Sequence, residues 1–222
     1  MRAMTNKRRN GYRTIAVVGL KGGIGKSLIS TLLACGFHRA KRKTLLVDAD
    51  DQGSTRTWRA KAIENSFDGP LVFPMDSRNI QHDLERAAEG YDVVVVDTPA
   101  RLQKEARASM MVADLVLLPA VRGGAGLWAL EQTLEVVEEA RAVRGELPAY
   151  LVPNRIEHTT LSQLALERLA ELPLPSTPGL GNRVAFDEAF TLGTDVCGLE
   201  PRSEAAAEAR TLFRAVARLE SK

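Results

Sequence analysis

Short, largely apolar runs recur along the chain and are separated by longer segments of mixed polarity. Strands that are buried on both faces read as continuous apolar runs, whereas half-exposed strands alternate. Because segments long enough for helices separate the runs, the pattern predicts an α/β fold, with one mostly parallel sheet and helices on both of its faces. The predicted strands are residues 14–18, 44–47, 71–73, 92–96, 114–118 and 149–152.

Helical periodicity is clearest in residues 126–144, where Leu127, Leu130, Leu134 and Val137 fall on one side of a helix. We expect this stripe to pack on the sheet and not to form a partner site. Further helices are predicted towards both ends of the chain, and a Pro- and Gly-rich loop separates two of them. These helices are residues 28–40, 161–171, 184–192 and 203–219, and the loop is residues 172–181.

Composition fits a single domain. The chain has 222 residues, of which 45% are hydrophobic, enough for one substantial core. Cys35 and Cys197 lie far apart in the sequence, so neither a disulfide framework nor a zinc site is predicted, and a reducing cytoplasm fits. The net charge is only +2, but basic residues cluster at the start of the chain. We therefore expect a flexible basic tail at residues 1–12 and one domain at residues 13–222.

A glycine-rich segment lies between the first predicted strand and the first predicted helix, with the sequence Lys21-Gly22-Gly23-Ile24-Gly25-Lys26-Ser27. In such a place, small residues allow successive backbone N–H groups to face a phosphate chain, and the helix N-terminus adds partial positive charge. The sequence thus predicts a nucleotide site in which Lys26 binds the β- and γ-phosphates and Ser27 ligates Mg²⁺. The other predicted contacts to the nucleotide are Gly22, Gly23, Ile24, Gly25 and Leu28.

This loop departs from the general phosphate-loop pattern. Leu20 stands where the first glycine is expected, and Lys21 supplies a second lysine. The segment resembles the deviant Walker A loop of the ParA/MinD ATPases. The resemblance runs from Ile15 to the final predicted helix and is closest to short ParA-type partition ATPases. It implies a P-loop sandwich domain, ATP and Mg²⁺ as cofactors, and a homodimer in which Lys21 acts catalytically by reaching the nucleotide of the partner.

Carboxylates follow two of the predicted strands. Asp48 and Asp50 end the second strand, and Asp97 ends a run of four valines. In a parallel sheet these positions lie at the carboxyl edge, where ligands bind. The resemblance implies that Asp50 activates the attacking water, that Asp48 supports the Mg²⁺ shell and that Asp97 is the Walker B carboxylate; strand-end turns or helix caps are the alternative. Asp51 replaces the proline that is usual in the family, and residues 98–102 take the place of its switch loop.

Weaker signals lie towards the C-terminus. Asn154 follows the last predicted strand, where related proteins hold the adenine, and its amide offers a donor and an acceptor; the alternative is a turn residue after Pro153. In short ParA proteins, basic residues of the C-terminal half bind nonspecific DNA once ATP has formed the dimer. By that resemblance Arg183, Arg202 and Arg210 are candidate DNA contacts, with ordinary surface arginines as the alternative.

The resemblance implies an ATPase that dimerises on ATP, binds nonspecific DNA and segregates or positions cargo. The cargo would be a plasmid, a chromosome or a protein assembly, and a ParB-like or other cargo adaptor would stimulate hydrolysis. The protein would then be cytoplasmic and nucleoid-associated, with no membrane partner expected because no apolar run is long enough to span a bilayer.

Two other functions compete with this interpretation. The first is a MinD-like membrane switch, in which residues 203–222 form an amphipathic membrane helix. Glu204, Glu208 and Glu220 in that segment would be repelled by anionic lipid, so core packing is the better interpretation. The second is a metabolic phosphate-loop ligase or synthase, which should add a substrate pocket. The sequence shows no further constellation of His, Cys or carboxylate residues outside the nucleotide site.

Overall fold

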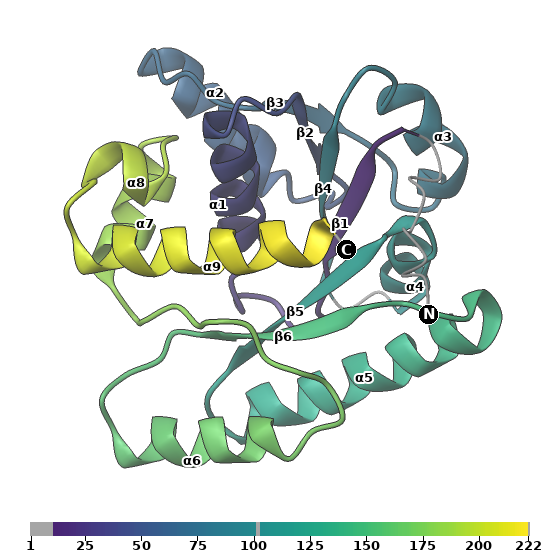
Figure 1. Ribbon diagram of the computed structural model, residues 1–222, viewed down its shortest axis with the longest axis vertical. Helices are drawn as coiled ribbons and strands as arrows, with labels where there is room; N and C mark the ends of the chain where they lie inside the picture. Colours follow the sequence, from purple (N-terminus) through teal and green to yellow (C-terminus); the bar gives the residue numbers. More distant parts are fainter. Residues whose placement is uncertain (1–10, 101–102, 222) are drawn as a thin grey trace, which may run out of the picture.

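The computed structural model describes residues 11–100 and 103–221. Within that part of the chain, the apolar runs form one sheet of six parallel strands in the order β3-β2-β4-β1-β5-β6 (Figure 1). This confirms the predicted fold class. The strands are β1 (Arg13–Val17), β2 (Thr44–Asp48), β3 (Leu71–Pro74), β4 (Val93–Asp97), β5 (Leu115–Val121) and β6 (Ala149–Asn154).

The last two strands are longer than their apolar runs predict. They stay paired past residues 118 and 152, in a register that places Val121 opposite Asn154. The prolines in this extension do not end the pairing, although proline often marks the end of a strand. As a result, Asn154 belongs to the strand itself and is held at the carboxyl edge of the sheet.

Helices cover both faces of the sheet (Figure 1). Helices α1, α7, α8 and α9 bury their apolar side chains in one core, and α3, α4 and α5 do so in the core on the other face. The helices are α1 (Lys26–Arg39), α2 (Ser54–Glu64), α3 (Ile80–Ala87), α4 (Gln103–Val112), α5 (Gly124–Arg144), α6 (Thr160–Ala170), α7 (Val184–Thr191), α8 (Val196–Leu199) and α9 (Glu204–Glu220).

Successive side chains along a strand point to opposite faces of the sheet, so each strand contributes to both cores. Ile15 and Val17 of β1 enter the core with α1 and α9, whereas Ala16 enters the core with α5. In α5, Leu130 and Val137 are buried there. The predicted stripe of this helix is therefore confirmed as core, and its burial fixes α5 along the sheet.

The C-terminal helix α9 packs inside the molecule. Its residues Leu212 and Val216 are completely buried, and Phe213 meets Phe37 of α1 edge to face at a centroid distance of 5.1 Å. The interpretation of this segment as a core helix is confirmed. In addition, none of the helices within the described residues is long and apolar enough to cross a bilayer.

Tyr12, which the sequence assigns to the end of the basic tail, is instead 8% exposed and belongs to the core that α3, α4 and α5 cover. Residues 1–10 of the predicted basic tail lie outside the described residues, so the prediction for them stays a prediction.

Candidate functional site

The glycine-rich loop connects the end of β1 at Val17 to the start of α1 at Lys26. Gly25 precedes the helix in a left-handed conformation with φ +92°, which glycine adopts without the steric cost that a Cβ would bring. Gly23 also has a positive φ, of +74°. The strand, loop and helix therefore have the arrangement that the sequence predicts for binding phosphates at a helix N-terminus.

Lys26 is the first residue of α1, directly after this loop, and is only 7% exposed. Its ammonium donates a hydrogen bond to the carbonyl oxygen of Lys21 at 3.3 Å. Burial lowers the pKa of Lys26, while the negative charges of Asp97 and Asp50 act in the opposite direction. The side chain is thus a desolvated cation, which interacts with phosphate more strongly than a solvated lysine does. Lys21 is half-buried at the start of the loop.

Asp97 lies at the end of β4, directly opposite Asp48 of β2 and Val17 of β1. The residue is completely buried, its Oδ1 accepts a hydrogen bond from the Ser30 hydroxyl at 3.4 Å, and the Ser27 side chain lies near its carboxylate. Its Oδ2 has no hydrogen-bond partner among the residues that the structure describes. Burial, reinforced by neighbouring carboxylates and opposed by Ser27 and Lys26, raises the pKa of Asp97 to about 7.

The oxygen atoms around Asp97 fit a divalent cation. Mg²⁺ prefers oxygen ligands and is usually held by one or two protein oxygens together with phosphate and water. Here a hydroxyl, that of Ser27, and an unpartnered carboxylate oxygen of Asp97 lie together at the base of the phosphate loop. A buried oxygen without a partner is uncommon in folded proteins, and a cation would resolve it.

Both carboxylate oxygens of Asp48 accept hydrogen bonds from the segment that follows β2. Its Oδ1 accepts from the backbone N–H of Asp50 at 3.2 Å, and its Oδ2 accepts from the backbone N–H of Arg56 at 2.9 Å. The Arg56 guanidinium also lies 3.4 Å from Oδ2. These contacts let Asp48 position the turn after β2 and the first turn of α2. Arg56 was not predicted as a partner of Asp48, because its place eight residues further along the chain follows no sequence pattern.

Asp50 is half-exposed at the turn after β2. Its Oδ1 accepts from the backbone N–H of Gln52 at 3.0 Å, and its carbonyl accepts from Gly53 at 2.9 Å. The turn therefore forms with Asp51 in place of the family's proline. Arg56 also donates to the carbonyls of Asp50 and Asp51, at 3.3 and 3.1 Å, which further fixes the turn.

These elements meet around one hollow of about 380 Å³ beside the phosphate loop. It brings together most of the predicted nucleotide contacts and adds three residues from beyond β6 that the sequence analysis did not assign to the site: Arg155, Asp187 and Phe190. Asp187 and Phe190 lie on α7, and no local pattern could link them to a loop so distant in sequence. The predicted residues that line the hollow are Gly22, Gly23, Gly25, Lys26, Ser27, Leu28 and Asp50.

Asn154 lies under the phosphate loop. Its side-chain nitrogen donates to the carbonyl oxygen of Ile24 at 2.8 Å, and its side-chain oxygen accepts from the backbone N–H of Arg155 at 3.0 Å. Only 3% of the residue is exposed. The contact with adenine stays a prediction.

The predicted switch loop begins at Thr98, whose hydroxyl donates to the carbonyl of Val17 at 2.8 Å. Residues 101–102 of this loop lie outside the described residues. The anchor at Thr98 joins the loop to β1 directly before the phosphate loop, so the two segments share a fixed base.

The three predicted DNA contacts differ in their surroundings. Arg183 forms ion pairs with Glu204 and Glu208, both at 2.7 Å, and the hydrogen bond to Glu208 raises its pKa. Arg210 donates to the carbonyl of Pro201 at 2.8 Å, and Arg202 is exposed. The charge of Arg183 is therefore balanced within the protein.

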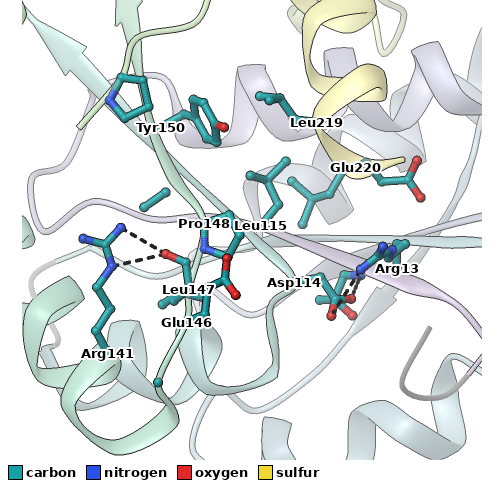
Figure 2. Close-up of a pocket in the computed structure, with 15 residues that line it drawn as sticks. Arg13, Asp114, Leu115, Arg141, Glu146, Leu147, Pro148, Tyr150, Leu219 and Glu220 are labelled. Atoms are coloured by element: carbon teal, nitrogen blue, oxygen red, sulfur yellow. Dashed lines mark hydrogen bonds and ion pairs between the residues drawn. The ribbon is translucent and has the colours of Figure 1, made fainter. Parts of the chain in front are cut away.

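A second hollow, of about 590 Å³, lies at the opposite edge of the sheet (Figure 2). Several of its charged side chains make internal contacts: Arg141 donates to the carbonyl of Leu147 at 3.2 Å, and Arg13 lies 4.0 Å from Asp114. Glu220 holds Arg42 through two hydrogen bonds. Among the described residues that line it there is no glycine-rich loop and no helix N-terminus. The edge with the phosphate loop is therefore the candidate site for a nucleotide.

Comparison with known proteins supports this assignment. Residues 15–194 match the family described as the CobQ/CobB/MinD/ParA nucleotide binding domain. The chain is 34% identical over 200 residues to maintenance of carboxysome distribution protein A of Halothiobacillus neapolitanus, covering 88% of this chain and 91% of that protein. It is 30% identical over 185 residues to the chromosome-partitioning ATPase Soj of Thermus thermophilus, covering 68% and 73%.

A solved structure extends the comparison to the fold. The septum site-determining protein MinD of Pyrococcus horikoshii, complexed with Mg-ADP, superposes with a TM-score of 0.74 at 18% identity. The superposition covers 94% of this chain and 97% of that one. At this identity the likeness shows that the two chains share a fold.

Proposed function

Because the chain belongs to the CobQ/CobB/MinD/ParA family of nucleotide-binding ATPases, we propose that it hydrolyses ATP with Mg²⁺ to position a protein assembly over DNA. In this proposal ATP binding forms a homodimer, the dimer binds DNA without sequence preference, and a cargo-bound adaptor stimulates hydrolysis. The protein then resides on the nucleoid while it carries ATP.

The observation that carries the ATPase proposal is the base of the phosphate loop. Ser27 and the unpartnered oxygen of Asp97 lie together below a hollow lined by Lys26 and Asp50. Oxygen ligands for a hard cation, a desolvated ammonium for phosphate and a carboxylate for a water molecule are the groups that phosphoryl transfer to water requires.

Each residue has a definite task in this proposal. Ser27 and Asp97 hold Mg²⁺, which when bound neutralises charge on the phosphates. Lys26 and the backbone N–H groups of the loop bind the β- and γ-phosphates. Asp50 orients the attacking water and accepts its proton, and Asp48 keeps the turn that carries Asp50 in place. Lys21 completes the phosphate site of the partner protomer.

The cargo proposal draws on the two relatives. One is named for the distribution of carboxysomes and is similar along 88% of this chain, and the other is named for chromosome partitioning and is similar along 68%. The longer and more identical match favours a protein assembly as cargo. Arg202 and Arg210 are the proposed DNA contacts with no carboxylate partner among the described residues, whereas Arg183 is paired.

The proposal is tested by measuring self-association and DNA binding with ATP, ADP and no nucleotide, across a series of salt concentrations. We expect a dimer and a steep dependence of DNA affinity on salt with ATP alone, because phosphate contacts release counterions. A protein that remains monomeric with Mg·ATP at every concentration would contradict the proposal.

Lys21→Ala tests the role of the second lysine. This variant should bind ATP and fail to hydrolyse it, because the loop stays intact but the partner's phosphates lose a cation. Lys61→Ala is the matched control, since Lys61 is an exposed lysine on α2 that pairs with Glu64. Normal turnover in Lys21→Ala would refute the role assigned to Lys21.

A further inference from the structure

We propose that Asn154 is a positioning residue that locks the Ile24–Gly25 peptide, so that the N–H of Gly25 and not the carbonyl of Ile24 faces the bound phosphates. This inference rests on the proposed function, because it assigns a role within the same triphosphate site. It replaces the expectation that the Asn154 amide recognises the base.

The lock connects two segments that are 130 residues apart in sequence. The Asn154 nitrogen donates to the Ile24 oxygen at 2.8 Å, and its oxygen accepts from the N–H of Arg155 at 3.0 Å. Turning the amide over would place oxygen against oxygen and nitrogen against nitrogen, so this orientation is the one that satisfies both neighbours. Arg155 itself has a φ of +56°, a left-handed conformation that is uncommon for a residue with a side chain.

Peptide planarity transmits this contact to the ligand side of the loop. In a trans peptide the C=O and N–H groups point in opposite directions, and the described residues contain no cis peptide. Because Asn154 holds the Ile24 carbonyl on its own side, the Gly25 N–H points away from Asn154. Gly25 also lines the hollow beside the phosphate loop.

A loop of glycines needs such a lock. Gly23 and Gly25 both have positive φ, and glycine moves between backbone conformations at low cost. If the Ile24–Gly25 peptide turned over, its carbonyl oxygen would point towards the phosphates and repel them. The packing at this point is close, because a Cβ on Gly25 would lie 2.2 Å from the Asn154 nitrogen. Asn154 thus occupies the space that the missing side chain leaves.

The positioning role of Asn154 and a direct contact with the base predict different effects on ligand binding. A residue that reads the base should affect ATP alone, whereas one that orients a loop N–H should affect any triphosphate. The test therefore compares Mg·ATP with inorganic Mg·tripolyphosphate, which has no base and no ribose, by titration calorimetry. Asn154→Ala should weaken both ligands by the same factor, on the order of tenfold, because each loses the same oriented donor.

Two further variants make the result decisive. Asn154→Leu keeps the branched shape and the number of heavy atoms of the side chain without either hydrogen bond, so it should give the same parallel loss even if the alanine variant folds poorly. Asn182→Ala is the matched control, because Asn182 hydrogen-bonds to Glu157 at 2.7 Å in a neighbouring loop. The control should bind both ligands as the wild type does.

The outcomes distinguish the lock from the proposed function. If the Asn154 variants lose ATP binding but bind tripolyphosphate as the wild type does, Asn154 contacts the base. That result would overturn the proposed positioning role, while the ATPase proposal stands. Unchanged binding of both ligands in a folded Asn154→Leu protein would also overturn it. If the wild-type protein bound neither ligand, the proposed function itself would fail.

Discussion

At the scale of single residues, the site combines groups that are costly to bury with the contacts that hold them. Asp97 is the strongest example, since its carboxylate is completely buried and one oxygen has no partner among the described residues. Such a group lowers the stability of the empty protein and is retained because it serves a ligand. Stability and function at Asp97 should therefore change in opposite directions.

Asp97→Asn should stabilise the nucleotide-free protein. Burial raises the pKa of Asp97 to about 7, so the native state holds a proton that the unfolded chain releases near pH ~4. Native stability therefore falls as pH rises from about 4 to about 7, and a neutral amide escapes this loss. The gain should be about 2 kcal/mol at pH 5 and about 4 kcal/mol at pH 8. Thermal unfolding with chelator at both pH values checks this.

The control for this experiment is Glu131→Gln, which changes an exposed carboxylate on α5. It should leave the unfolding temperature nearly unchanged at both pH values. An Asp97→Asn protein that is less stable than the wild type at pH 8 would show that the carboxylate is satisfied by contacts other than those described here.

Residue-level chemistry could be predicted where it is local in sequence. The phosphate-binding role of the loop from Lys21 to Ser27 could be predicted, because the strand, the glycines and the helix that form the site are adjacent in sequence. The partners of Asp48 and Asn154 could not be predicted in the same way. Arg56 and Ile24 meet these side chains only because strand register and loop conformation bring them together, and neither is encoded in a short pattern.

At the scale of elements, the packing of α9 on α1 decides between a core helix and a membrane helix. Gly36 of α1 lies against the ring of Phe213, and a Cβ at Gly36 would come within 2.4 Å of that ring. The two helices approach closely because one position has no side chain. The ring also contacts Phe37 edge to face.

Gly36→Ala should destabilise the protein by roughly 1–3 kcal/mol, because the added methyl group overpacks the contact with Phe213. Phe213→Leu should cost less and should relieve the clash when the two changes are combined, so that the double variant is more stable than additivity predicts. Urea unfolding of the three variants and the wild type measures the coupling energy. Strict additivity would mean that α9 does not rest on α1 at this point.

At the scale of the whole molecule, the layers were predictable and the strand order was not. Every strand of a parallel sheet with two covered faces is apolar, so the runs at residues 44–47, 92–96 and 114–118 resemble one another. Their order depends on how the crossover helices pack, which no single run encodes. The observed order places β1 between β4 and β5, and this brings Asp97 beside the phosphate loop.

The three arginines proposed to contact DNA differ in whether carboxylates of the protein already balance their charge. Arg183 is neutralised by Glu204 and Glu208, so its removal should change stability more than DNA affinity. Arg202 and Arg210 have no carboxylate partner among the described residues. Each contact to a DNA phosphate contributes about 0.9 to the slope of log affinity against log salt.

Arg202→Ala and Arg210→Ala should therefore each weaken ATP-dependent DNA binding and reduce the magnitude of the salt slope by about 1. Arg183→Gln should leave the slope nearly unchanged while it lowers the unfolding temperature, because Glu204 and Glu208 then lose their shared cation. Fluorescence anisotropy on a nonspecific duplex across a salt series gives the slopes, and ATP-dependent dimerisation of each variant is the control. If only Arg183→Gln changes the slope, its ion pairs must open on DNA, and the binding surface is centred on the start of α7 and not on Arg202 and Arg210.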